Sequence, residues 1–280
     1  HLPRLTRASA TPASASGARS GQGRDRPDPV TSAAEHALGD DTLVFLHLPK
    51  TGGTALRTSL LEAFDPSASA LIYPGGELDS GMTVEHFRGL PEDQRARMRL
   101  VIGHVRFGIH ESIPGRSQYA ILLRDPVDRI VSLYYHYRNL PGVRFGSKGY
   151  RERLRLRLTR ASLEDWVFRN VRPAVDNTAV RNVTSRPGVR AGACPDDMLD
   201  EALAHVEQHF IALLVTERMQ ESAALLSARI GRPLAAVGTA NRNPRRPGLA
   251  EIDQRVLDRI RELNRLDVQL YEYALKQLGP

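Results

Sequence analysis

The segment HLPKTGGTAL, residues 47–56, combines one lysine, two adjacent glycines and two threonines. Paired glycines allow a tight turn in which several backbone N–H groups can point at one anion. The lysine adds a full positive charge, and the threonines add hydroxyl donors. We therefore predict a phosphate-binding loop built from Lys50, Thr51, Gly52, Gly53, Thr54 and Ala55.

Arg124 and Ser132 form a second candidate anion site. The apolar run 119–123 predicts a strand that ends just before the arginine, and Pro126 suits the first turn of a following helix. Open α/β sheets bind ligands at the carboxyl ends of their strands, and a planar guanidinium can bind a phosphate through two donors. Ser132 lies two helical turns beyond Arg124 and can face the same anion. The alternative for Arg124 is a surface ion pair with Asp125 or Asp128.

A general base is available in His104, which follows the apolar run 100–103. Histidine can accept a proton near neutral pH, so it suits the activation of a hydroxyl group. A strand end at residue 103 predicts that His104 lies at the same edge of a sheet as Lys50 and Arg124. His110 and Glu111, slightly farther along, are the second candidates for the base, or contacts for an acceptor.

These residues can act together only in a fold that brings the ends of several strands close to one another. Short apolar runs alternate with helical patterns along the chain, which predicts an α/β fold with a parallel sheet flanked by helices. We expect strands at 43–48, 70–73, 100–103, 119–123 and 210–215, and helices at 56–64, 126–137, 163–170, 196–209, 217–230 and 251–278.

Composition limits the organisation of the chain. Residues 1–40 are rich in Ala, Ser, Arg, Gly and Pro, which predicts a disordered arm before a single domain at 41–280. The formal net charge of +7 favours an anionic partner. No apolar run approaches the roughly 20 residues needed to span a bilayer, and no signal segment opens the chain. We therefore expect no membrane span and a cytoplasmic location, although a start at His1 leaves room for a removed targeting segment.

Two of these motifs carry a resemblance to a known family. The sequence PKTGGT after a strand resembles the loop by which cytosolic and Golgi-type sulfotransferases hold the 5′-phosphosulfate of PAPS, and Arg-Asp-Pro with a helical serine resembles their 3′-phosphate motif. Gly-His-Val at 103–105 resembles the catalytic-histidine segment of heparan sulfate 2-O-sulfotransferase. The chain is therefore most similar to carbohydrate sulfotransferases of the heparan sulfate 2-O/6-O type, as a bacterial-type member.

The resemblance implies a P-loop-like sulfotransferase fold and a role for each motif. Residues 50–55 hold the 5′-phosphosulfate of PAPS, Arg124 and Ser132 hold its 3′-phosphate, and Arg245 and Arg246 of a basic loop close over the nucleotide. His104 takes the acceptor proton during in-line transfer, and Lys50 stabilises the departing PAP. The expected acceptor is a hydroxyl of a carbohydrate or glycoconjugate, and no metal is needed.

Two other classes of function remain as alternatives. A nucleotide-dependent phosphotransferase or kinase predicts the pattern G-x-x-x-x-G-K-[ST], but Lys50 precedes both glycines. A nucleic-acid-binding protein predicts a basic stripe interleaved with aromatic residues. The basic segment 151–160 alternates arginine with leucine instead, as in a helix or an acceptor-binding face. We therefore expect no nucleic-acid partner.

Overall fold

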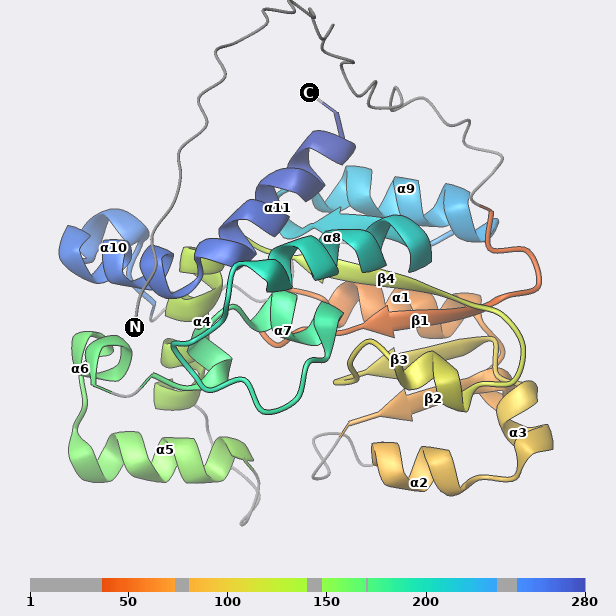
Figure 1. Ribbon diagram of the computed structural model, residues 1–280, viewed down its shortest axis with the longest axis horizontal. Coiled ribbons are helices and arrows are strands. Elements are labelled where there is room, and N and C mark those ends of the chain that lie inside the picture. The colour runs from red at the N-terminus through yellow and green to blue at the C-terminus, as the bar shows by residue number, and fades with distance from the viewer. Residues whose placement is uncertain (1–36, 74–80, 140–147, 170, 236–245, 280) are drawn as a thin grey trace, which may run out of the picture. The chain divides into compact units, whose positions relative to one another are not determined.

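A five-stranded parallel sheet lies at the centre of the computed structural model (Figure 1). The structure describes residues 37–73, 81–139, 148–169, 171–235 and 246–279. Its strand order is β2-β3-β1-β4-β5, and every neighbouring pair is parallel. The strands are β1 (Thr42–Leu46), β2 (Ser69–Ile72), β3 (Leu100–Gly103), β4 (Ser117–Leu123) and β5 (Phe210–Val215).

The sheet is buried on both faces, as its uninterrupted apolar strands predict. All residues of β1, β3 and β5 are buried. One face packs against α1 (Thr54–Ala63) and α9 (Met219–Ile230). The other face packs against α7 (Thr178–Thr184), α8 (Asp197–His209) and α11 (Arg265–Gln277). The predicted α/β class, with helices flanking a parallel sheet, is confirmed.

A third apolar cluster lies beyond the carboxyl ends of the strands, at the left of Figure 1. It joins α4 (Pro126–Asn139), α5 (Lys148–Thr159), α6 (Leu163–Phe168) and α10 (Gln254–Leu263) around the buried rings of Tyr134 and Trp166. The remaining helices are α2 (Val84–Gly89) and α3 (Glu92–Ala96), with short 3₁₀ turns η2 (Pro66–Ala68), η3 (Ile109–Ser112), η4 (Pro173–Val175), η5 (Thr216–Arg218) and η6 (Leu249–Glu251).

The continuous helix expected at 251–278 is two helices that meet at Asn264. The Asn264 side chain is fully buried; its Nδ2 donates to the carbonyl of Val175 at 3.0 Å, and its Oδ1 accepts from the backbone N–H of Asn177 at 3.2 Å. The same Nδ2 also donates to the carbonyl of Ile260, four residues earlier, at 2.9 Å. Asparagine side chains compete in this way with the backbone bonds of a regular helix, which explains the break. This joint fixes α10 against the third cluster and α11 against the sheet.

Packing begins a few residues before β1. Leu38 is buried, and its backbone N–H donates to the carbonyl of Arg229 at 2.9 Å. Residues 1–36 lie outside the described part, so the division into an arm at 1–40 and a domain at 41–280 stays a prediction.

Candidate active site

The strand order gathers the predicted chemistry at one edge of the sheet. Because β1 lies between β3 and β4, the residues that follow these three strands are neighbours at their carboxyl ends. Lys50 follows β1, His104 follows β3 and Arg124 follows β4. Tyr73 and Thr216 follow the flanking strands β2 and β5.

The loop between β1 and α1 has the backbone form that the sequence predicts. Lys50 and Gly52 both adopt left-handed conformations, with φ of 71° and 74°. Gly53 is required for a different reason, since a Cβ there would lie 2.9 Å from the ring of His47. The helix α1 begins directly afterwards, and no side chain caps its first N–H groups. These N–H groups and the helix dipole favour an anion at this end.

Thr51 stabilises the loop from within. Its side chain is fully buried, and its hydroxyl donates to the carbonyl of Leu48 at 3.0 Å. The hydroxyl of Thr216 lies within hydrogen-bond distance of the carbonyl oxygens of Thr51 and Leu123, the latter at 2.8 Å. The loop is thus tied to the ends of β4 and β5, and the Thr51 hydroxyl already has a backbone partner.

Three cations from distant parts of the chain meet beside this loop. The Nη1 of Arg124 donates to the carbonyl of Lys50 at 3.0 Å. The Nε of Arg124 donates to the carboxylate of Asp128 at 2.7 Å, and Arg246 forms an ion pair with the same carboxylate. Asp128 is held in turn by its backbone N–H, which donates to Asp125 at 2.7 Å. One carboxylate therefore holds two arginines next to Lys50.

The positive charge of this cluster perturbs its own members. Burial, followed by the charges of Arg124 and Arg246, lowers the pKa of Lys50 below its usual 10.5. Burial and the charge of Arg124 lower the pKa of Arg246 to about 10. The Nε of Arg246 is also buried without a hydrogen-bond partner. Cations that destabilise one another in this way are stabilised when an anion binds between them.

Ser132 and Arg129 lie on different faces of α4. Ser132 is one helical turn beyond Asp128, so both residues share the face that meets Arg124 and Arg246. Arg129 is buried, and it donates to the hydroxyl of Thr178 at 2.9 Å. Its role is therefore in packing α4 against the 173–178 segment.

His104 belongs to a group of three rings. Its ring centroid lies 4.8 Å from that of Tyr73 and 5.5 Å from that of His47. The Nδ1 of His47 shares a hydrogen bond with the Tyr73 hydroxyl at 2.7 Å. Tyr73 is buried, whereas both histidines are partly exposed. Two imidazoles therefore stand beside the Lys50 loop, one of them already fixed by a tyrosine.

A family model described as galactose-3-O-sulfotransferase matches residues 7–278 of the 280. The chain belongs to the galactose-3-O-sulfotransferase family. One relative in this family is mouse galactose-3-O-sulfotransferase 2, which is 24% identical over 245 residues. The match includes 82% of this chain and 60% of the relative, so the chain spans less than two thirds of the relative's length.

Among solved structures, mouse sulfotransferase SULT7A1 complexed with PAP covers 86% of this chain and 92% of its own, with 17% identity and a TM-score of 0.29. Agreement this low adds nothing to the family assignment.

Two expectations from the sequence are wrong in the light of the family. The chain is a galactose-3-O-sulfotransferase family member and not a bacterial-type relative of the heparan sulfate 2-O/6-O enzymes. The short motifs are shared too widely among sulfotransferases to separate these groups. The expected cytoplasmic location is also contradicted, because the homologue in this family is a Golgi-type sulfotransferase. Among the described residues, no helix has both the length and the apolar character needed to cross a bilayer.

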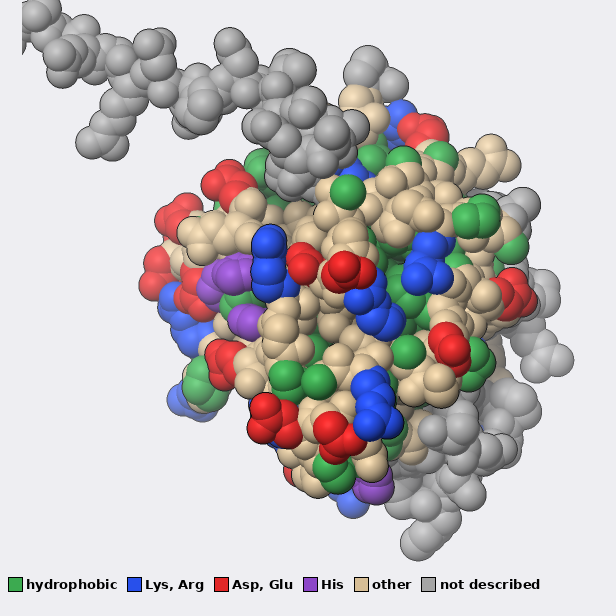
Figure 2. All heavy atoms as spheres, turned by 90° about the vertical axis from the view of Figure 1, so that its right-hand side faces the viewer, with side chains coloured by type: hydrophobic (Ala, Val, Ile, Leu, Met, Phe, Trp, Pro, Cys, Tyr) green, Lys and Arg blue, Asp and Glu red, His purple; other side chains and the backbone are tan. Residues whose placement is uncertain are grey.

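The structure does not bring His110 and Glu111 to this edge. After β3 the chain turns back toward the start of β4, and both residues lie in η3 on this return. The ring of His110 contacts the Tyr119 hydroxyl at 2.7 Å and lines a hollow of about 710 Å³ with residues that precede β1, β4 and β5. Figure 2 faces the edge where the strands begin, and histidine side chains are visible there.

Other predictions have different outcomes. Arg245 lies outside the described residues, whereas its neighbour Arg246 joins the cation cluster. Sequence reasoning missed Tyr73, because only the fold shows that it contacts His47. The ion pair of Arg124 with Asp128, the alternative for that arginine, is present, but the second pair of Asp128 with Arg246 was not predicted. In the described ranges, no group of three or more His, Cys, Asp or Glu side chains is arranged to hold a metal ion.

Proposed function

We propose that this protein transfers a sulfuryl group from PAPS to the 3-hydroxyl of a galactose residue in a glycan. The observation that carries the proposal is the convergence of Lys50, Arg124 and Arg246 beside an uncapped helix N-terminus. Three cations fit a donor that carries two separate phosphate groups. The galactose acceptor is suggested by the family and by the name of the mouse relative.

The residues present fit the nucleotide. The Lys50 loop offers backbone N–H groups and a lysine to the 5′-phosphosulfate, and Gly53 lets the loop pass close to the ring of His47 because it has no Cβ. Arg124, Arg246 and Ser132 surround the position proposed for the 3′-phosphate. The lowered pKa of Lys50 and of Arg246 supports an anion between them, because burial and mutual repulsion disfavour their charges in its absence.

Each catalytic requirement of the transfer has a candidate residue. PAPS supplies the sulfuryl group when bound. His104 accepts the proton of the attacking hydroxyl, and Lys50 stabilises the negative charge that develops on the departing phosphate. His47 is held by its hydrogen bond with Tyr73, and it keeps the ring of His104 in position beside the Lys50 loop. The acceptor oxygen and the phosphate leaving group lie on opposite sides of the sulfur during in-line transfer.

The experiment uses the full chain with ³⁵S-labelled PAPS and paired oligosaccharide acceptors. One acceptor of each pair ends in galactose, and the other ends in 3-deoxygalactose. We expect label in the first acceptor only, with transfer abolished by Lys50→Ala. Equal labelling of both acceptors would contradict the position of sulfation. Binding of PAP without transfer to any galactose-ended acceptor would leave the nucleotide site but overturn the acceptor class.

A further inference from the structure

The helix α5 presents leucines on both of its sides. Leu156 is buried in the third cluster together with the carboxylate of Glu152. Leu154 and Leu158 are one turn apart on the opposite side, with 41% and 76% of their surfaces exposed. Large apolar side chains are usually placed inside a fold, so an exposed pair on one helical face requires an explanation.

Contacts of Glu152 prevent the helix from rotating to bury these leucines. Its carboxylate accepts a hydrogen bond from Nε1 of the buried Trp166 at 2.7 Å and forms an ion pair with Arg172. A rotation that brought Leu154 inward would expose Glu152 and break both contacts. It would leave the indole N–H buried without a partner, which is costly. The outward position of the leucines is therefore built into the fold.

Arginines flank the exposed leucines on both sides. With about 100° between successive residues of a helix, Arg151 and Arg155 lie on one side of the leucine pair, and Arg153 and Arg157 lie on the other. Arg151 and Arg157 are exposed, whereas Arg153 and Arg155 are partly buried and Arg155 forms an ion pair with Glu152. Glu152 is the only acidic residue of α5, and it points inward. The outward face thus combines an apolar stripe with positive charge alone.

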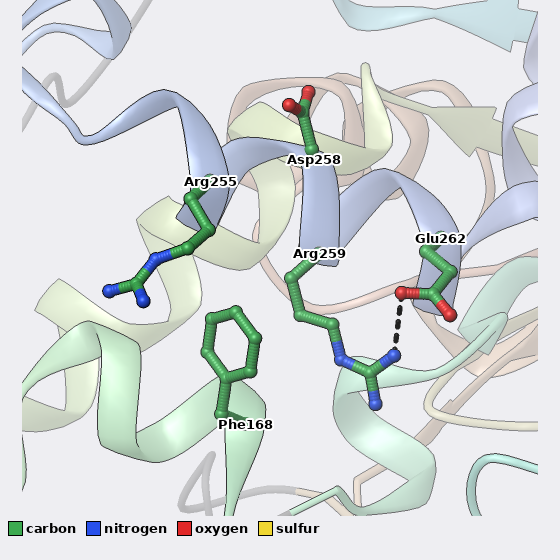
Figure 3. Close-up of a pocket in the computed structure, with 5 residues that line it drawn as sticks. All are labelled: Phe168, Arg255, Asp258, Arg259 and Glu262. Carbon is green, nitrogen blue, oxygen red and sulfur yellow. Dashed lines mark hydrogen bonds and ion pairs between the residues drawn. The ribbon is translucent and has the colours of Figure 1, made fainter.

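The third exposed large apolar side chain of the described residues, Phe168, has a different environment. Its ring stands between the guanidinium groups of Arg255 and Arg259, whose central carbons lie 5.7 and 5.8 Å from the ring centroid (Figure 3). These residues line a hollow of about 570 Å³ that includes none of the predicted site residues. This ring already has cation–π partners within its own fold, so the leucines of α5 carry the inference alone.

We propose that the outward face of α5 docks the protein on an anionic lipid surface. Leucines enter the boundary between headgroups and acyl chains, while the exposed Arg151 and Arg157 contact negative headgroups. A second copy of the chain is a poorer partner, because pairing two such faces would bring arginines together. An acidic glycan would pair with the arginines but would leave the leucines in water.

The test is co-sedimentation of the full chain with vesicles. One vesicle is pure phosphatidylcholine, and the other contains equal parts of phosphatidylcholine and phosphatidylserine. We expect at least about tenfold stronger binding to the anionic vesicles, as several arginines near the surface imply. The double variant Leu154→Ser, Leu158→Ser should lose most of this binding, and Leu154→Phe, Leu158→Phe should strengthen it. Binding of PAP should be unchanged in both variants, which separates this proposal from the proposed function.

Arg97 provides the control for charge, because it is exposed directly after α3, which lies at the other end of the domain from α5 (Figure 1). Arg157→Ser should weaken vesicle binding, whereas Arg97→Ser should not. Equal binding by the wild type and the double serine variant would overturn the proposal. If Arg157→Ser lost binding to a soluble sulfated polysaccharide but kept vesicle binding, α5 would bind an acidic glycan instead.

Discussion

Arg124 donates from Nε to the carboxylate of Asp128 over 2.7 Å, across the junction between β4 and α4. The same carboxylate pairs with Arg246, from a segment near the end of the chain. Asp128 thus pairs with two of the three cations of the candidate site, Arg124 and Arg246. The third cation, Lys50, belongs to the loop between β1 and α1. A carboxylate among cations can either compete with a bound phosphate or orient the arginines for it, and these two roles predict opposite effects.

We expect Asp128→Asn to weaken PAP binding by about tenfold, as loss of charge-assisted hydrogen bonds implies. The arginines would lose the partner that fixes their orientation. The preference for PAP over AMP should fall as well, because AMP lacks the 3′-phosphate proposed to lie between them. Isothermal titration calorimetry with both nucleotides measures the two effects. Asp128→Glu keeps the charge and should restore part of the affinity. Tighter binding of PAP to the Asn variant would mean that Asp128 competes with the phosphate.

Much of this site could be predicted from the sequence, because short apolar runs show where the strands end. A parallel sheet places residues after β1, β3 and β4 at one edge, so Lys50, His104 and Arg124 could be brought together in advance. The contact of Asp128 with Arg246 could not be predicted, because it joins segments that are remote in the chain. His110 is only six residues after His104, yet the chain has turned back toward the opposite edge by then. Proximity in sequence therefore misled the prediction where the backbone reverses.

Gly53 offers a test of the loop that spares every charged group. In Gly53→Ala the new methyl would lie 2.9 Å from the ring of His47, so the loop or the ring must move. We expect PAP affinity and turnover both to fall by at least about tenfold, which corresponds to about 1.4 kcal/mol. Gly89→Ala is the matched control, because a Cβ at that position meets no atom within 4 Å. Thermal unfolding of both variants checks that the fold is retained. Normal PAP binding by Gly53→Ala would show that the loop does not hold the nucleotide.

The lowered pKa of Lys50 predicts how nucleotide binding depends on pH. Burial, Arg124 and Arg246 lower this pKa in the free protein, and a bound phosphate should raise it again. Binding therefore favours the protonated lysine. PAP affinity should be highest at neutral pH. It should decline as the pH rises through the lowered pKa of Lys50, which lies below the pKa of 10.5 of an ordinary lysine.

Calorimetric titrations at several pH values above neutrality measure this decline. In Lys50→Arg the side chain stays charged over the same range, so the early decline should disappear. Any remaining loss should begin near pH 10, where Arg246 titrates. A wild-type affinity that stays constant up to pH 10 would contradict a role for Lys50 in binding PAP.

His104 is proposed to act on the acceptor and not on the nucleotide, so its loss should separate turnover from donor binding. A positioned general base contributes about 10²–10⁴-fold to the rate, and we expect His104→Ala to lower kcat by that factor. PAP affinity should stay nearly normal. His47→Ala provides the comparison, since His47 shares a hydrogen bond with Tyr73 at 2.7 Å and packs against Gly53. That variant should disturb the loop and weaken PAP binding. If His47→Ala instead lowered kcat by this factor with PAP binding intact, the base would be His47.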